Sequence, residues 1–238
     1  MEDKTTNSLN LSLKLMEPKI ARNFYLTALN PQNGYYYNFG SEFVYGLTAA
    51  IVLDLYREKR ITLQNKKVII VNPEATNYPV FDKVLELIGR KQPLSIAALI
   101  GRLAIRGQFY KKELIRLLEL NKDLVRIRKS VIGISYNRYF PADHDYRMSV
   151  IRRMRDILLR NEEPSNEELL LLIILHACQL YRALSDIREE RKRMRIRMKS
   201  ILKGESCYTH DFENIKALST GIQRAIQAAH ATHTAASS

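Results

Sequence analysis

The side chains with the clearest chemical potential are basic residues clustered near the middle of the chain. Three lie on the outer face of a predicted helix at 109–121, opposite its leucines, and two precede that helix at helical spacing. Lys111 and Lys112 fall in its first turn, where free backbone N–H groups also attract anions. Because lysine and arginine bind phosphate through charge-assisted hydrogen bonds, the cluster indicates an anion site if its side chains converge. Its members are Arg102, Arg106, Lys111, Lys112 and Arg116.

Catalytic and metal-binding motifs are missing from the sequence. It contains no Gly-rich phosphate loop, Cys-x-x-Cys, His-Glu-x-x-His or Gly-x-Ser-x-Gly motif. His176 lies in a strongly apolar run, which favours a core histidine with a satisfied hydrogen bond. His230 and His233 form only a pair, whereas a metal site needs more ligands. We therefore predict no catalytic residue, no metal site and no cofactor.

The composition favours a globular protein with an anionic partner. The 238 residues include 38 Lys+Arg against 25 Asp+Glu, and the resulting net charge of +13 attracts nucleic acid or an acidic membrane surface. Two cysteines, Cys178 and Cys207, form no disulfide framework and fit a reducing, cytosolic location. The N-terminus does not resemble a signal peptide, and the apolar run at 169–178 is shorter than the ~20 residues of a bilayer span. Any membrane contact is therefore expected to be peripheral.

Hydrophobic periodicity predicts a mainly α protein: a single helical domain around a central apolar helix, with two β-hairpins. The central helix is expected at 166–182, because it is apolar on all sides. Period-two patterns predict hairpins at 61–71 and 124–135. Further helices are predicted from Phe43 onward and at 80–90, 95–106, 109–121, about 148–158, 184–203 and 211–229.

No break in composition divides the chain, which favours one folded domain at 24–229. A polar segment precedes it at 1–23, where Pro18 is expected to prevent a helix near its end. The small and polar residues 230–238 are expected to form a disordered tail.

Two apolar features are candidates for contact with a membrane. Residues 35–47 place tyrosines, phenylalanines and two glycines at the entrance of an apolar helix, and such aromatics suit a boundary between water and lipid. The second predicted hairpin carries Val131, Ile132 and Ile134 near its tip. These residues pack either into the core or, alternatively, against a bilayer or a second copy of the chain.

Several short segments follow one another in an order typical of one protein family. They are Tyr45-Gly46-Leu47, Leu53-Asp54-Leu55, Lys59-Arg60-Ile61-Thr62-Leu63, Val71-Asn72-Pro73-Glu74-Ala75-Thr76, Val80-Phe81-Asp82-Lys83-Val84-Leu85 and Leu175-His176-Ala177-Cys178. In this order they resemble the Golgi phosphoprotein 3 family, whose members bind phosphatidylinositol 4-phosphate. The resemblance covers about residues 24–229.

The resemblance implies a non-enzymatic peripheral membrane protein with a basic pocket for the phosphatidylinositol 4-phosphate headgroup. The positions of the family's pocket fall on Phe39, Thr48, Gln108 and Lys111. Phe39 stands where a tryptophan is usual, and Thr48 and Gln108 replace basic residues. Arg106 and Lys112 are candidates to supply the missing charge.

The resemblance also suggests partners and a location. Eukaryotic members bind cytosolic tails of glycosyltransferases and recruit a vesicle coat through a basic N-terminal segment, but residues 1–18 contain only Lys4 and Lys14. We expect an anionic phospholipid surface as the main partner, with tails of membrane enzymes or a second copy of the chain as further candidates. The implied location is cytoplasmic and membrane-associated, at the Golgi in a eukaryote, and the departures are compatible with a divergent, bacterial member.

A second class of function stays open from the sequence alone. A helix followed by a hairpin is the outline of a winged helix, and a charge of +13 also suits nucleic-acid phosphates. Arg126, Arg128 and Lys129 lie on the second hairpin, as a DNA-binding wing requires. A winged-helix-like nucleic-acid-binding protein is therefore the alternative, less favoured than a lipid-binding one.

Overall fold

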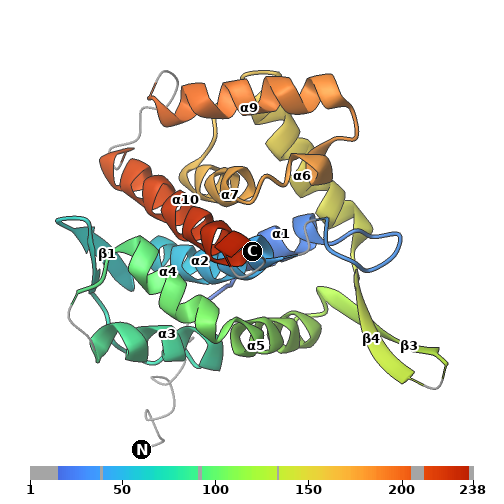
Figure 1. The fold of residues 1–238 in the computed structure, drawn as a ribbon, viewed down its shortest axis with the longest axis horizontal. Coiled ribbons are helices and arrows are strands. Elements are labelled where there is room, and N and C mark those ends of the chain that lie inside the picture. The colour runs from blue at the N-terminus through green and yellow to red at the C-terminus, as the bar shows by residue number, and fades with distance from the viewer. Residues whose placement is uncertain (1–15, 38–39, 91–92, 133, 205–211, 236–238) are drawn as a thin grey trace, which may run out of the picture.

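A computed structural model describes residues 16–37, 40–90, 93–132, 134–204 and 212–235. Figure 1 shows helices stacked around a common core, with one hairpin projecting away from them. The helices are α1 (Lys19–Ala28), α2 (Ser41–Arg57), α3 (Pro79–Gly89), α4 (Ile96–Ile105), α5 (Gly107–Leu120), α6 (His144–Leu159), α7 (Asn166–Ala177), α8 (Tyr181–Leu184), α9 (Arg188–Leu202) and α10 (Phe212–Ala235). The strands are β1 (Ile61–Gln64), β2 (Lys67–Ile70), β3 (Leu124–Val131) and β4 (Ile134–Pro141), paired antiparallel as β1–β2 and β3–β4. The predicted fold class is confirmed.

Two apolar helices share the centre of the core. Helix α7 is buried on all sides from Leu169 to Leu175, as its sequence predicts. Helix α2 is buried without interruption from Gly46 to Leu55, and it contacts α1, α3, α4, α5, α7, α10 and β1. A Cβ at Gly46 would lie 2.4 Å from Cys178 Sγ and 2.6 Å from Phe24 Cζ. The glycine therefore lets α1 and the end of α7 approach the α2 backbone.

Helix α1 begins directly after Pro18, where the sequence predicts no helix. A helix leaves the N–H groups of its first residues unpaired, so a proline at its start costs no hydrogen bond. Proline breaks a helix from the inside, whereas Pro18 precedes α1. The helix lies across the predicted boundary between residues 23 and 24. Its aromatic and apolar side chains, including Phe24 and Tyr25, are fully buried.

Two buried polar side chains from other helices complete the ends of α1. The Asp54 carboxylate of α2 accepts hydrogen bonds from the backbone N–H of Ile20 at 2.9 Å and of Ala21 at 2.8 Å. At the other end, Arg147 of α6 donates to the carbonyls of Leu26 at 2.9 Å and Leu29 at 3.2 Å. A negative group thus meets the helix N-terminus and a positive group the C-terminus, which is the favourable arrangement for the helix dipole.

Both hairpins form where they are predicted, but the second is longer. Strands β3 and β4 pair from Leu124 with Pro141 to Val131 with Ile134, beyond the predicted strands at 124–128 and 131–135. Lys129 and Ser130 continue the first strand, because an exposed ladder tolerates polar residues on both faces. The prediction placed the turn too early for that reason.

The C-terminal third differs from its prediction in helix lengths. Helix α7 ends at Ala177, because Gln179 adopts φ 54°, and a short α8 separates it from α9. Helix α10 continues to Ala235, so residues 230–235 of the predicted tail are helical. Cys178 is buried as expected, and Cys207 lies outside the described residues.

Candidate functional site

The first turns of α2 and α5 meet at a glycine. A Cβ at Gly107 would lie 2.1 Å from Cγ1 of Val44, so glycine at this position brings the backbone of α5 against α2. The sequence predicts helices at 95–106 and 109–121, and the second of them, α5, begins earlier, at Gly107. The helix that carries the predicted basic residues therefore starts beside the aromatic segment at the entrance of α2.

Lys111 occupies the junction between α5 and the aromatic segment. Its Nζ lies 4.8 Å from the centroid of the Tyr36 ring and 5.7 Å from that of Phe43. These two rings stack with their centroids 3.9 Å apart, and the Tyr36 hydroxyl lies 2.7 Å from that of Tyr25 in α1. The ammonium group is therefore held over a rigid aromatic platform through cation–π contacts.

The charge of Lys111 has no carboxylate partner within the described part of the chain. Its side chain is partly buried, and this burial lowers the pKa of the ammonium group. A partly desolvated cation gains more from an anion than a fully hydrated one does. Because no side chain caps the first turn of α5, its leading backbone N–H groups add to the attraction.

The other predicted pocket residues occupy different environments. Gln108, Arg106 and Lys112 are exposed around the start of α5. Thr48 is fully buried, and its hydroxyl donates to the carbonyl of Tyr45 at 3.0 Å, so it presents no atom to solvent. Phe39 lies outside the described residues. Among the predicted pocket residues, Lys111 is therefore the one whose side chain has defined contacts at a partly exposed position.

Tyr36 and Phe43 are the partners of Lys111 that sequence reasoning missed. The sequence marks them as part of an aromatic cluster at 35–47, but it does not indicate which basic residue they meet. That contact joins two segments about seventy positions apart in the chain, and only the packing of Gly107 against α2 reveals it.

The second hairpin is anchored on the same aromatic segment and exposes its apolar tip. At its base, Arg138 lies over the Tyr35 ring, with 3.3 Å from guanidinium carbon to ring centroid, and a Cβ at Gly34 would lie 3.0 Å from the Tyr139 carbonyl oxygen. At its tip, Ile132 is 98% exposed and Ile134 is 73% exposed. Of the two predicted alternatives, the one that packs Ile132 and Ile134 into the core is therefore wrong. The side chain of Val131 lies outside the described ones.

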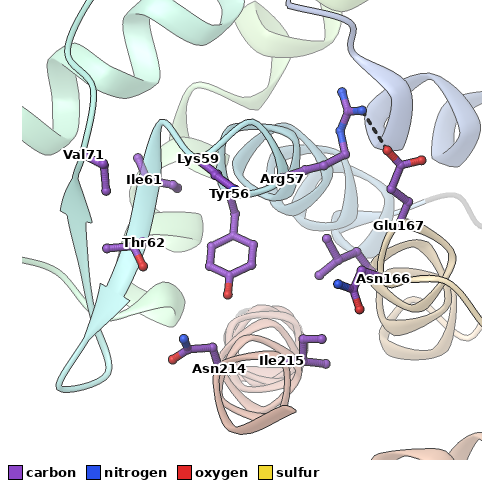
Figure 2. Close-up of a pocket in the computed structure, with 11 residues that line it drawn as sticks. Tyr56, Arg57, Lys59, Ile61, Thr62, Val71, Asn166, Glu167, Asn214 and Ile215 are labelled. Carbon is purple, nitrogen blue, oxygen red and sulfur yellow. Dashed lines mark hydrogen bonds and ion pairs between the residues drawn. The ribbon is translucent and has the colours of Figure 1, made fainter. Parts of the chain in front are cut away.

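A cavity of about 450 Å³ lies at the opposite end of α2, between the β1–β2 hairpin, α7 and α10 (Figure 2). Its lining is mostly apolar, with Tyr56 projecting toward Asn214. Arg57 at its edge donates to Glu167 at 3.0 Å and pairs with Glu58 at 2.8 Å. Because this arginine is already neutralised by carboxylates, the cavity is a poor candidate for an anionic headgroup.

The surface expected of a DNA-binding wing is partly neutralised. Arg126 of β3 makes two hydrogen bonds of 2.7 Å to the Glu119 carboxylate of α5, which leaves Arg128 and Lys129 as the exposed cations of that strand. Among the described helices, none has both the length and the apolar character that a membrane span needs. The described residues also contain no group of three or more His, Cys, Asp or Glu side chains placed to hold a metal ion.

The fold and the site together define a helical protein that holds a cation against an aromatic platform beside an exposed apolar hairpin. A comparison with protein-family models agrees with the resemblance seen in the sequence: the Golgi phosphoprotein 3 (GPP34) family model matches residues 20–229. The chain belongs to this family. The match begins in α1, the helix that the sequence does not predict. No curated protein sequence matches the chain.

Proposed function

We propose that this chain is a non-enzymatic peripheral membrane protein that binds anionic lipid headgroups of the phosphatidylinositol 4-phosphate type at Lys111. The observation that carries the proposal is a partly buried ammonium group with no carboxylate partner among the described residues, fixed against Tyr36 and Phe43. Family membership supports the same function. Tyr36, which is partly exposed, is an aromatic of the kind that suits the boundary between headgroups and hydrocarbon, whereas Phe43 supports it from the core.

The lipid preference is proposed to be broader than for a single phosphoinositide. Thr48 is buried and Gln108 is uncharged, so Lys111 is the one predicted pocket residue that carries a charge. The exposed Arg106 and Lys112 add long-range attraction without a fixed geometry. Attraction of this kind recognises charge density more than headgroup shape.

The exposed hairpin tip is proposed to strengthen the attachment. Ile132 and Ile134 gain free energy when they leave water, either in a bilayer or against a second copy of the chain. An adaptor role for the cytosolic tails of membrane enzymes is a further part of the proposal, supported by family membership alone.

Vesicle flotation of the wild-type protein tests this function. We expect binding to vesicles of phosphatidylcholine with phosphatidylserine or phosphatidylinositol 4-phosphate, and little binding to phosphatidylcholine alone. Raising NaCl from about 0.1 M to about 1 M shortens the Debye length from about 10 Å to about 3 Å and should release most of the protein. Equal binding to neutral and anionic vesicles would refute the proposal.

A further inference from the structure

A second pocket lies beside the start of α2 and has a different lining. It encloses about 270 Å³ between the end of α7, α8, α9 and α10, which is ample room for a group much larger than a water molecule. Its polar side chains come from four separate segments, and none of its lining residues carries a negative charge. They are His176, Ala177, Gln179, Tyr181, Arg195, Gln223, Ile226 and Gln227.

Contacts through α2 place this pocket at the same end of the protein as Lys111. Cys178, between the pocket residues Ala177 and Gln179, contacts the Glu42 carbonyl oxygen at 3.4 Å in the first turn of α2. The ring of the next residue, Phe43, makes a cation–π contact with the Lys111 ammonium group. The end of α7 and the start of α5 therefore both pack on the N-terminal end of α2.

The pocket contains hydrogen-bond donors with fixed positions. His176 Nδ1 lies 2.6 Å from the Tyr181 hydroxyl. Burial raises the pKa of Tyr181, so the hydroxyl keeps a proton that it can donate to Nδ1, and in that tautomer the imidazole proton lies on Nε2. In that tautomer His176 offers a donor to the pocket, and the side-chain amides of Gln223 and Gln227 offer others.

Positive charge faces these donors without compensation. Arg195 lies over the Tyr181 ring, at 5.3 Å to its centroid, and makes no ion pair within the described part of the chain. Burial first, and then the charges of Lys199 and Arg195, lower the pKa of His176. The local potential is therefore positive, and a bound anion complements it.

We propose that this pocket binds a phosphate-bearing anion at a second site, separate from Lys111 and on the same end of the protein. A guanidinium, an imidazole N–H and amide N–H groups are the donors that a phosphate accepts from. The phosphate could belong to a second lipid headgroup or to a soluble phosphate ester, because the recognised chemistry is the same. Only the lipid source rests on the proposed membrane function.

Titration with inorganic phosphate, followed by NMR of the histidine imidazole signals, tests the second site. His176 is identified by the signal lost in His176→Asn, and NaCl at equal ionic strength serves as the salt control. We expect a saturable shift of the His176 signals in the wild-type protein. Arg195→Glu should weaken the phosphate affinity at least about tenfold, since hydrogen bonds to charged groups are the strong ones.

Two further variants make the test specific. Gln223→Glu introduces a carboxylate while leaving Arg195 in place, and it should weaken phosphate as well. Lys192→Glu makes the same charge reversal on an exposed part of α9 outside the pocket, and it should bind phosphate like the wild type. No saturable shift of His176, or equal phosphate affinity of Arg195→Glu and Lys192→Glu, would overturn the proposal.

Vesicle flotation of the same variants then identifies the source of the phosphate. Weaker flotation of Arg195→Glu than of Lys192→Glu on phosphoinositide vesicles supports a second headgroup, and equal flotation supports a soluble phosphate. Lys111→Glu should lose flotation while its His176 signals still respond to phosphate. A failure of the membrane function is therefore distinguishable from a failure of the second site.

Discussion

Replacing Asp54 by alanine is expected to lower the free energy of unfolding by about 3 kcal/mol. The carboxylate is fully buried and accepts hydrogen bonds from the N–H groups of Ile20 and Ala21 at the start of α1. Its removal leaves two backbone donors without a partner, at about 1–3 kcal/mol each when buried. Above about pH 7, where Asp54 is ionised, it also removes the negative group that the helix N-terminus favours.

Urea denaturation monitored by circular dichroism measures this loss. Asp186→Ala is the control, because this exposed carboxylate makes no side-chain contact in the described part of the chain and should change stability by less than about 0.5 kcal/mol. Equal stability of the Asp54 and Asp186 variants would show that the bonds to α1 contribute nothing.

The same residue makes stability depend on pH in a stated direction. Burial raises the pKa of Asp54 from 3.8 to about 7, against the opposing effect of its two N–H partners. Between these values the folded protein keeps a proton that the unfolded chain releases, so stability falls as pH rises through the window, by up to about 1.4 kcal/mol per unit. Asp54→Asn cannot titrate. The wild type should therefore lose stability relative to this variant from about pH 4 to pH 7, and a constant difference would contradict the assignment.

Replacing Ile132 and Ile134 together by aspartate is expected to weaken vesicle binding by about 100-fold. Full burial of one isoleucine is worth about 1.5–3 kcal/mol, so partial immersion of two gives about 3 kcal/mol, which corresponds to roughly that factor. Because Ile132 is 98% and Ile134 is 73% exposed, the substitution should leave the free energy of unfolding unchanged.

Flotation and light scattering on the same samples separate the two roles of the hairpin tip. The control replaces Val71 and Ile187 by aspartate; each is 57% exposed, and they lie just after β2 and just before α9. Loss of binding in the hairpin variant alone supports insertion into the bilayer. A change of oligomeric state with unchanged binding by each protomer would instead make the tip a contact between copies.

The sequence predicts the individual helices and strands better than it predicts the contacts between them. Helix α7 and the first hairpin follow from local patterns, because their apolar periods are strong and the hairpin turn contains Asn65, which adopts positive φ. The second hairpin is predicted with its turn too early. Helix α1 does not follow, because Asp54 and Arg147, which complete its ends, lie at least 33 and 118 positions along the chain from the groups they bind. No local pattern records such a contact.

The candidate site also has features that the sequence predicts and others that depend on contacts in the fold. Lys111 emerges from the resemblance and from the pattern of the predicted helix at 109–121, although α5 begins at Gly107 and therefore places Lys111 in its second turn. Its contact with Tyr36 and Phe43 depends on how Gly107 packs against Val44. The replacement at Thr48 is visible in the sequence, whereas its complete burial is not. Burial depends on the neighbours that α2 acquires in the folded core.

The most direct test of the account is the flotation of Lys111→Glu on anionic vesicles. Each basic residue near such a surface contributes about 1 kcal/mol, so charge reversal should cost about 2 kcal/mol and weaken binding about 30-fold. Lys67→Glu, the same change at the exposed first residue of β2, should bind within about twofold of the wild type. Equal binding by Lys111→Glu and Lys67→Glu would contradict the central role assigned to Lys111.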